Sequence, residues 1–501
     1  MGCCGVSHAH SREENPNIQK YKKRVSQTNI FDLRQKYEFI SILGNGGFGK
    51  VRLYRDKKYK DLLFAIKTLK KEGISPYEFN LLKNELNILS NLDHPNIVKY
   101  YREYEDDHYI HIVMEYLKGY DLYKIIALKT YNNLDEQNMC EIIYQLLKAL
   151  SFIHSQNIVH RDIKPENIVF ANKKDYSSLK LIDFGLATNT KRDIHTVGTP
   201  YYMAPEMIEK FSCPHSYIWS VGVIVYLMLT GKYPFEMKEG EDLFNKIKND
   251  KIDLKPLNIS RASNEAKDFI QKCLKKDYNQ RMTTSQALEH EWINKFYIKK
   301  YSNLLNNNTV DTLLNFANKD ALQKEIYYFI AKICSEQDIN KLKHFFNKLD
   351  VDNSGILTIE ELEKGFKEIN IGITKEELQQ IWEGLDFHKD GQINYSEFLA
   401  AMASSYNFQK EEKLWYAFNL FKEGNKAKSY ITYDSMCNAV KNLNLNINEK
   451  EIKKCFEKYN KTIDFKTFKK LILDSELEDK NWKEYESTNG CSRRSSKKVL
   501  N

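Results

Sequence analysis

The chain has 501 residues, of which 42% are hydrophobic and 29% charged, with 20 glycines and 9 prolines. This composition excludes collagen-like, low-complexity and wholly disordered proteins, and the length suggests about three folding units of ~150 residues. The net charge of +8 is small for this length, so we expect no nucleic-acid partner. Nine scattered cysteines without CxxC spacing indicate neither a zinc site nor a disulfide framework, and we expect a cytoplasmic, reducing location.

Residues 1–36 form a basic tail that carries seven Lys or Arg against three acidic residues. The initiator methionine is followed by Gly2, Cys3 and Cys4, a pattern that suggests myristoylation of the glycine and palmitoylation of the cysteines. Two lipids anchor a protein stably, and nearby basic residues add attraction to an anionic membrane surface. Position six is Val6 rather than the usual Ser or Thr, so an unmodified tail is the alternative.

Short β-branched and aromatic stretches alternate with turn residues over residues 37–100, which predicts a strand-rich unit. Within it Gly44, Gly46 and Gly49 have GxGxxG spacing, which lets backbone amides approach phosphates. The residues after the last glycine continue as a strand rather than a helix, which favours a phosphate-covering hairpin over a dinucleotide-binding turn. Lys67 follows on an apolar strand; alone, it would read as an exposed strand lysine.

Helical periodicity dominates from residue 133 onward and encloses three further motifs. They are His160-Arg161-Asp162-Ile163-Lys164-Pro165-Glu166-Asn167, then Asp183-Phe184-Gly185, then Ala204-Pro205-Glu206. Together with the glycine run and Lys67, these motifs resemble the protein kinase signature over residues 37–295. The resemblance implies an α+β bilobal fold with a β-rich N-lobe and an α-helical C-lobe.

The resemblance also implies a role for each matched residue. Asp162 would accept the proton of the substrate hydroxyl, Lys164 would neutralise charge on the transferred phosphate, and Asn167 and Asp183 would bind Mg²⁺. Lys67 would hold the ATP phosphates and be oriented by Glu85, with Glu78 the less favoured partner. The residues expected around ATP are Leu43, Gly44, Gly46, Gly49, Val51, Ala65, Lys67, Glu85 and Glu115.

Substrate preference follows from the same resemblance. Lys164 and the Gly198-Thr199-Pro200 run are typical of serine/threonine rather than tyrosine kinases. Glu166 and Asp121 match acidic positions that in many relatives contact an Arg before the phosphoacceptor, so we expect protein substrates with basic residues before Ser or Thr. For Asp121, a solvated carboxylate at a helix start explains the residue equally well.

Two positions depart from the kinase pattern. Tyr217 stands where the family has a buried Asp that holds the catalytic loop. Losing that acceptor could loosen the loop. His195 stands where many kinases carry a phosphorylated Thr, so obligatory activation by phosphorylation is not expected, although Thr196 lies beside it. Glu206 has its expected partner in Arg281.

An Asn-rich stretch around residues 303–308 predicts a linker, after which helical patterning resumes near residue 310. The segment from Asp350 to Glu361 then has the spacing of an EF-hand calcium loop with glycine at position 6. Its expected ligands are Asp350, Asp352, Ser354, Ile356 through its carbonyl, Thr358 and Glu361.

Thirty-six residues later the segment from Asp386 to Glu397 repeats this pattern. Its expected ligands are Asp386, His388, Asp390, Gln392 through its carbonyl, Asn394 and Glu397. His388 is a poor ligand for a hard cation, so a lower affinity or a metal-free structural loop is left open. The resemblance to paired EF-hand loops implies a small sheet shared by the two loops, here through Leu357 and Ile393.

Two more EF-hand frames follow, centred on Ile431 and Ile463, and neither retains ligands. Counting back from Ile431 places Gly424, Lys426 and Lys428 at ligand positions and Ser435 at position 12; the last loop is short and ends on Thr467. Residues 335–404 hold 7 basic and 14 acidic residues, whereas residues 405–475 hold 14 and 9. We therefore expect calcium to act only on the first pair.

A kinase joined to four EF-hand frames resembles the calcium-dependent protein kinases of plants and protists. The expected organisation is a basic tail (1–36), a kinase domain (37–295), a linker with a regulatory junction helix (296–334), an all-α calmodulin-like EF-hand domain (335–475) and a flexible basic tail (476–501). In the junction, Leu322, Ile326 and Phe329 share one helical face.

We hypothesise a monomeric, calcium-activated serine/threonine kinase that uses ATP, Mg²⁺ and Ca²⁺. The junction helix would occlude the substrate cleft until calcium at the first EF pair captures it. A calcium-responsive pseudokinase scaffold, motivated by Tyr217, is the competing reading. Regulation by separate calmodulin would leave the EF-hand loops unexplained.

Overall fold

The computed structural model describes residues 33–473, except for 47–48, 59, 73–75, 107, 129–133, 189–197, 238–240, 261, 298–306, 335, 369–371, 404–410, 423–428, 443–444, 446 and 459–461. The predicted sites at Gly2, Cys3, Cys4, His195 and Thr196 lie outside these residues, as do residues 1–32 and 474–501 and the third-frame positions Gly424, Lys426 and Lys428. The chain forms two compact units, one of Met1–Lys319 and Tyr328–Phe408, the other of Asp320–Tyr327 and Gln409–Asn501.

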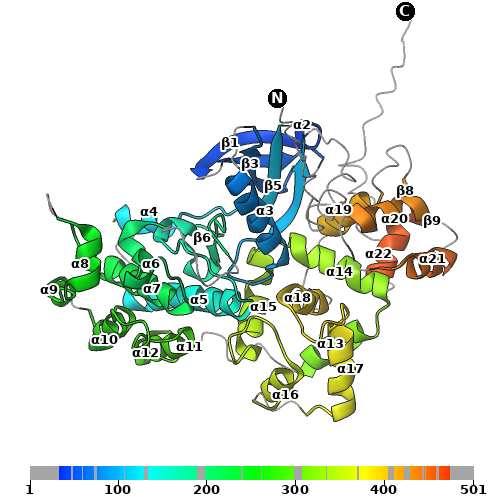
Figure 1. The fold of residues 1–501 in the computed structure, drawn as a ribbon. Coiled ribbons are helices and arrows are strands. Elements are labelled where there is room, and N and C mark those ends of the chain that lie inside the picture. The colour runs from blue at the N-terminus through cyan, green and yellow to red at the C-terminus, as the bar shows by residue number, and fades with distance from the viewer. Residues whose placement is uncertain are drawn as a thin grey trace, which may run out of the picture. The chain divides into compact units, whose positions relative to one another are not determined.

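The N-lobe of the first unit is a five-stranded antiparallel sheet in the order β1-β2-β3-β5-β4 (Figure 1). Its strands are β1 (Tyr37–Gly46), β2 (Gly49–Asp56), β3 (Leu63–Lys70), β4 (Tyr100–Glu105) and β5 (Tyr109–Glu115), preceded by α2 (Leu33–Lys36). Because β1 and β2 pair directly on either side of the glycine run, the predicted hairpin is confirmed. Helix α3 (Pro76–Asn91) packs on the sheet through Leu82 and Leu86.

The C-lobe is helical and is built around α5 (Glu136–Ser155) and α7 (Pro214–Thr230). Helix α7 is apolar on nearly all sides and is therefore buried at the centre. It ends at Gly231, whose φ of 69° is the left-handed conformation typical of a helix C-terminus. Of the described helices, none is both long and apolar enough to cross a membrane.

Short elements complete the C-lobe and position its loops. They are α4 (Leu122–Ala127), η1 (Pro165–Asn167), β6 (Ile168–Phe170), η2 (Tyr176–Ser178), β7 (Leu179–Leu181), η3 (Pro200–Tyr202), α6 (Pro205–Ile208), α8 (Leu243–Asn249), α9 (Lys255–Ile259), α10 (Asn264–Cys273), α11 (Thr284–Leu288) and α12 (Glu291–Phe296). Strands β6 and β7 pair antiparallel between the two motifs of the predicted active site, which fixes the spacing of those motifs.

The first EF-hand pair belongs to the same unit as the kinase lobes. Its helices are α15 (Glu336–Leu349), α16 (Ile359–Glu368), α17 (Lys375–Leu385) and α18 (Tyr395–Ala403). Leu357 and Ile393 pair through two backbone hydrogen bonds of 2.8 and 3.1 Å, so the predicted link between the loops is confirmed.

The junction differs from the expected linker with one regulatory helix within residues 296–334. It forms two helices, α13 (Asn307–Ala317) and α14 (Ala321–Ile333), and α13 begins inside the stretch expected to be a linker. The break has a physical cause: Asp320 and Gln323 exchange backbone-to-side-chain hydrogen bonds of 2.8 and 3.0 Å, which starts a new helix. Helix α13 packs on α17 and α18, where Ala317 lies directly against Gly384.

The second unit contains the first half of α14 and the second EF-hand pair. Its other elements are α19 (Glu411–Phe421), β8 (Tyr430–Thr432), α20 (Tyr433–Asn442), α21 (Glu449–Lys458), β9 (Thr462–Asp464) and α22 (Phe465–Leu473). Strands β8 and β9 pair through Ile431 and Ile463. The α14 segment is held by Gln323 and Tyr327, whose side chains donate to the carbonyls of Leu471 and Ile472 at the end of α22.

Candidate active site and calcium loops

The catalytic loop joins α5 to β6 and gathers three polar side chains around Asp162. Lys164 Nζ lies 2.6 Å from Asp162 Oδ2, and Thr199 Oγ1 donates to Asp162 Oδ1 at 2.9 Å. Lys164 Nζ also lies 3.0 Å from Thr199 Oγ1, which closes a triangle. Asn167 Nδ2 donates to the backbone oxygen of Asp162 at 2.8 Å and to its Oδ2 at 3.1 Å. The carboxylate is thus fixed in position beside a cation, as a proton acceptor for a substrate hydroxyl requires.

Two residues of this region have strained backbones. Arg161 and Asp183 have φ values of 67° and 60°, in the left-handed region where a side chain costs about 1–2 kcal/mol. The surrounding contacts hold that conformation: Arg161 Nε donates to the Leu186 carbonyl at 2.6 Å, and His160 Nε2 lies 3.1 Å from the Ile182 carbonyl. The two motifs are therefore tied to one another through buried hydrogen bonds.

Lys67, Glu85 and Asp183 form the charged centre between the lobes. Lys67 Nζ lies 2.5 Å from Glu85 Oε1 and 3.4 Å from Asp183 Oδ1. Burial favours a lower pKa for Lys67, but the attraction of Glu85 and Asp183 outweighs it and raises the pKa above the ordinary value. Burial likewise favours a higher pKa for Asp183, but Lys67 and His160 outweigh it and lower the pKa. Lys67 therefore stays cationic and Asp183 anionic near neutral pH.

This arrangement fits ATP and Mg²⁺. Asp183 and Asn167 offer the hard oxygen ligands that Mg²⁺ prefers, and Lys67 offers a fixed positive charge for phosphate. In the hairpin above them, a Cβ at Gly49 would clash with the carbonyl oxygen of Thr68, so only glycine fits there. A Cβ at Gly44 would meet open space.

The remaining predicted ATP residues lie on the sheet. Val51 pairs with Lys67 and Leu53 with Ala65 across β2 and β3, and Leu43 is exposed on β1. Glu115 ends β5, but its carboxylate accepts the Lys99 N–H at 2.6 Å and faces Lys180 at 3.5 Å. The Glu115 side chain is therefore occupied, as is its backbone N–H, which donates to the Lys99 carbonyl at 3.0 Å.

The substrate side of the C-lobe is held by a bidentate pair, since Arg281 donates to both carboxylate oxygens of Glu206 at 2.6 and 2.9 Å. Asp121 caps α4 by accepting the Lys124 N–H at 2.8 Å, which accounts for this residue without a substrate.

Tyr217 is 1% exposed and stacks on His154 with ring centroids 4.8 Å apart. Burial raises the pKa of its hydroxyl, and the backbone N–H groups of Arg161 and His160, which face the hydroxyl oxygen, oppose that rise. The Tyr217 hydroxyl therefore lies beside the catalytic-loop backbone that an aspartate holds in the family, and the His160, Arg161 and Asn167 side chains add further contacts.

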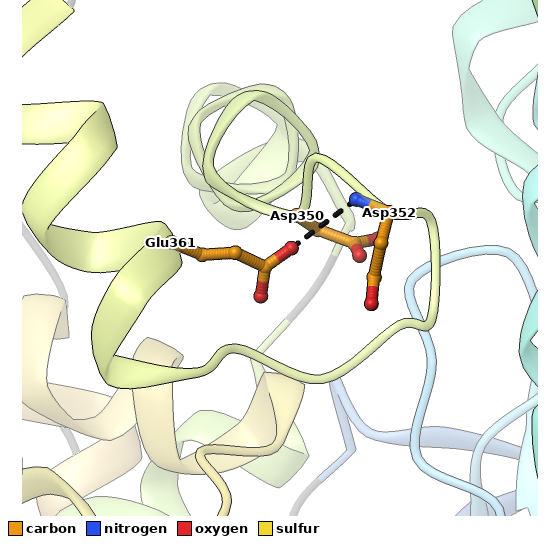
Figure 2. Close-up of side chains that lie close together, drawn as sticks. All are labelled: Asp350, Asp352 and Glu361. Carbon is orange, nitrogen blue, oxygen red and sulfur yellow. Dashed lines mark hydrogen bonds between the residues drawn. The ribbon is translucent and has the colours of Figure 1, made fainter.

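The first calcium loop brings Asp350, Asp352 and Glu361 together, with one carboxylate oxygen of each within 4.8 Å of the others (Figure 2). Among the described residues this is the sole such cluster of acidic, His or Cys side chains. Glu361 reaches back from α16 and accepts the N–H groups of Val351 at 2.8 Å and Asp352 at 3.2 Å. Burial raises the pKa of both Asp350 and Glu361; Lys148 opposes the rise at Asp350, and the N–H groups of Thr358 and Asp352 oppose it at Glu361.

The other ligand positions of this loop complete the turn. Gly355 at position 6 has a φ of 77°, which a side chain would strain. Ser354 Oγ lies 3.2 Å from the Ile356 carbonyl, and Thr358 donates its backbone N–H to Glu361 Oε2 at 3.0 Å. The turn of the loop is therefore formed, and its three carboxylates lie close enough together to share one Ca²⁺.

The second calcium loop uses its carboxylates differently. His388 Nδ1 lies 2.6 Å from Glu397 Oε1, and Asp386 accepts the N–H groups of Asp390 and Gly391 at 3.0 and 3.1 Å. Gln392 N–H bonds Asp390 at 3.1 Å and Asn394 N–H bonds Glu397 at 3.0 Å. Burial raises the pKa of Glu397 despite the imidazole. The six predicted positions share one loop, but their acidic and His groups do not cluster as those of the first loop do.

Sequence reasoning missed two residues at these sites. Thr199 bridges Asp162 and Lys164, and the sequence suggested it only as a marker of substrate class. Lys148 of α5 lies in the first calcium loop, with Nζ 2.7 Å from Asp350 Oδ2. The available signal was a lysine inside the buried run Leu146-Leu147-Lys148-Ala149-Leu150.

Comparison with known proteins agrees with both halves of the structure. The chain matches the protein kinase domain over residues 37–293 and an EF-hand domain pair over residues 339–403. It is 34% identical over 423 residues to calcium-dependent protein kinase 34 of Arabidopsis thaliana, covering 83% of this chain and 79% of that protein. It is 34% identical over 436 residues to calcium-dependent protein kinase 5 of Plasmodium falciparum (isolate 3D7), covering 84% and 75%.

Proposed function

This chain belongs to the calcium-dependent protein kinase family and is a calcium-activated serine/threonine kinase; from that membership we propose how its own residues perform and control phosphate transfer. The observation that carries the proposal is the Asp162–Lys164–Thr199 triangle beside the Lys67–Glu85–Asp183 centre. A base, a cation next to it and a phosphate anchor are the parts that this reaction needs.

The proposed reaction transfers the γ-phosphate of ATP to a Ser or Thr hydroxyl. The hydroxyl oxygen bonds the γ-phosphorus, the bond from that phosphorus to the β–γ bridging oxygen breaks, and the hydroxyl proton passes to Asp162. Lys164 neutralises charge on the transferred group, and Lys67 holds the phosphates while Glu85 fixes its position. Asn167 and Asp183 would hold Mg²⁺, which neutralises phosphate charge.

Control is proposed to lie in the first EF-hand pair. Ca²⁺ would bind the Asp350–Glu361 loop and, with lower affinity, the Asp386–Glu397 loop, because His388 replaces an oxygen ligand. Binding would then shift the junction of residues 296–334, now seen as α13 and α14, and open the substrate cleft. The packing of α13 on α17 and α18 supports this coupling, because the junction already contacts the calcium-binding helices.

The test is phosphate transfer from magnesium-ATP to a Ser peptide with an Arg three residues before the Ser. Transfer with calcium, little transfer with chelator, and none by Asp162→Asn are expected. Replacing the Arg by Ala in the peptide should weaken transfer if Glu166 reads basic substrates. No transfer in either condition, by folded protein that binds calcium, would instead establish the pseudokinase scaffold that Tyr217 suggests.

Membrane anchoring through Gly2, Cys3 and Cys4 is part of the same proposal. The adjacent cysteines and the basic residues of the tail support it. Incorporation of labelled myristate that is lost in Gly2→Ala would support the anchor, and no incorporation by the unsubstituted chain would contradict it.

A further inference from the structure

A lysine of the kinase C-lobe lies among the ligands of the first calcium loop. Lys148 Nζ is 2.7 Å from Asp350 Oδ2, 3.2 Å from the Asp350 carbonyl and 2.8 Å from Asn353 Oδ1. The side chains of Lys148 and Asp350 are both 0% exposed. Asp350 is position 1 of the loop, a carboxylate that a bound calcium would need.

The loop is fitted closely to α5 around this lysine. A Cβ at Gly355 would clash with the Phe152 ring and lie 2.9 Å from His94. Ser155 Oγ donates to the Ser354 carbonyl at 3.2 Å, and Ile356 packs against the apolar core of the C-lobe. The contact is therefore a formed interface rather than a single ion pair.

Further polar contacts extend this interface along the EF-hand pair, where α15 lies beside the C-terminal end of α5 (Figure 1). Lys343 of α15 donates to Gln145 Oε1 at 3.1 Å and to the Ser177 carbonyl at 2.8 Å. Ser396 of α18 donates its backbone N–H and its hydroxyl to Asp93, both at 2.9 Å. These contacts use no oxygen at a predicted calcium-ligand position.

Lys148 and calcium cannot use Asp350 together. Calcium binds carboxylate oxygens at about 2.3–2.6 Å, and a divalent ion that close to Asp350 would face the ammonium across one carboxylate in a buried site. Two cations held that close repel strongly where water is excluded. Occupation of the loop by calcium therefore requires Lys148 to leave it.

We propose that Lys148 is the resident cation of the first calcium loop in the calcium-free kinase, and that calcium acts by displacing it. Displacement removes the contact of Lys148 with the first calcium loop, whereas the Lys343 and Ser396 contacts, which use no calcium ligand, stay in place; Lys148 lies on α5, the helix that leads into the catalytic loop at Asp162. The inference rests on the proposed function in one respect, that the Asp350–Glu361 loop binds calcium. Docking of Lys148 in the loop and binding of calcium exclude each other. The free energy by which Lys148 stabilises the docked loop therefore weakens calcium binding by the same amount.

The test is calcium titration of the full chain that carries Glu397→Gln. This substitution removes a ligand of the second loop, so that the titration measures calcium binding to the first loop. Lys148→Gln should bind calcium at least about tenfold more tightly than the background protein, because no cation has to be displaced. The matched control is Lys343→Gln, which changes an equally buried lysine of the same interface and should shift the affinity less than about threefold.

A second variant guards against misfolding of Lys148→Gln. Asn353 lies at position 4, contributes no calcium ligand and has a φ of 61° that glycine tolerates. Asn353→Gly removes one acceptor of Lys148 and should tighten calcium binding about threefold.

The outcomes separate the two proposals. Unchanged or weaker calcium binding in both Lys148→Gln and Asn353→Gly would overturn the displacement of Lys148 and leave the proposed function standing. An equal gain in Lys343→Gln would also overturn it, since general loosening of the interface would explain the data. Absence of calcium binding by the Glu397→Gln protein itself would overturn both.

Discussion

The two EF-hand pairs share a frame but hold their loops by different means. In the first pair the position-12 residue of the first loop, Glu361, reaches into the loop and accepts N–H groups from Val351, Asp352 and Thr358. In the second pair the corresponding Ser435 only accepts the N–H of Thr432, at 2.9 Å, and donates back to the Thr432 carbonyl at 3.0 Å. One helix start faces an ion site, and the other is an ordinary helix cap.

The strand pairing between loops is common to both pairs. Leu357 pairs with Ile393, Ile431 pairs with Ile463, and all four side chains are 0% exposed. Burial of these apolar residues is thus sufficient to keep the helix-loop-helix frame when the metal ligands are lost. The helix-loop-helix frame therefore forms without metal ligands, and we expect calcium to act only on the pair that keeps its carboxylate ligands.

The largest expected effect contrasts the two position-12 residues. Glu361→Gln removes a carboxylate ligand and should raise the calcium concentration for half-maximal activity at least about tenfold, or ~1.4 kcal/mol. Ser435→Ala should leave that concentration unchanged and cost the second pair about 0.5–1.5 kcal/mol of folding free energy through the lost hydrogen bond from the Thr432 N–H, because Thr432 still caps the helix. Kinase activity measured as a function of free calcium checks the shift in calcium requirement. Urea unfolding checks the loss of folding free energy. Equal shifts in calcium requirement for Glu361→Gln and Ser435→Ala would contradict the claim that only the first pair binds calcium.

The next effect concerns the one nitrogen in the second loop. His388→Asp supplies an oxygen at position 3 and should tighten calcium binding to that loop about tenfold. The titration is made in the Glu361→Gln background, so that the second loop reports alone. His388→Asn, which supplies only a neutral oxygen, should gain less. No gain in either variant would show that the loop geometry, rather than its ligand set, limits affinity.

Two matched core substitutions distinguish the stability of each EF-hand pair from its calcium affinity. Leu357→Ala and Ile431→Ala should each destabilise their own pair by about 2–5 kcal/mol, because both remove a fully buried side chain. Leu357→Ala should also weaken calcium binding several-fold, since the strand that carries the Ile356 and Thr358 ligands loses its packing. Ile431→Ala should leave calcium affinity unchanged. A comparable loss of affinity in both variants would contradict the assignment of calcium to the first pair.

The smallest expected effect is that of calcium on the second pair, which should be none. Calorimetric titration of the full chain should reach two calcium ions per chain, one for each loop of the first pair. A third or fourth ion would contradict the account directly. Glu361→Gln/Glu397→Gln protein should show no binding at the same calcium concentrations.

Much of the active site could be predicted because its motifs are local. The HRD-type loop, Lys67 and Asp183 were placed from spacing and resemblance, and the structure brings them together around Asp162 and Glu85. The hairpin after the glycines followed from strand patterning, and the Leu357–Ile393 link followed from the resemblance to paired EF-hand loops. These features depend on residues near one another in sequence or on a shared template.

What could not be predicted depends on contacts between distant segments. The Lys148–Asp350 pair joins residues 202 positions apart, and no local pattern marks which buried lysine will meet which loop. The break in the junction was also missed, because the apolar spacing of residues 310–334 continues through Asp320 and only the Asp320–Gln323 cap interrupts the helix. Tyr217 was found, but its contact with His154 was not, since stacking follows from packing.

The most direct test of the account is the rate of phosphate transfer by Glu361→Gln/Glu397→Gln protein, with calcium and with chelator. The matched control is Ser435→Ala/Thr467→Ala, which changes the corresponding residues of the second pair. The account predicts equal rates in the two conditions for the glutamate variant and full calcium stimulation for the control. Calcium stimulation that survives in the glutamate variant would contradict the claim that calcium acts through the first EF-hand pair.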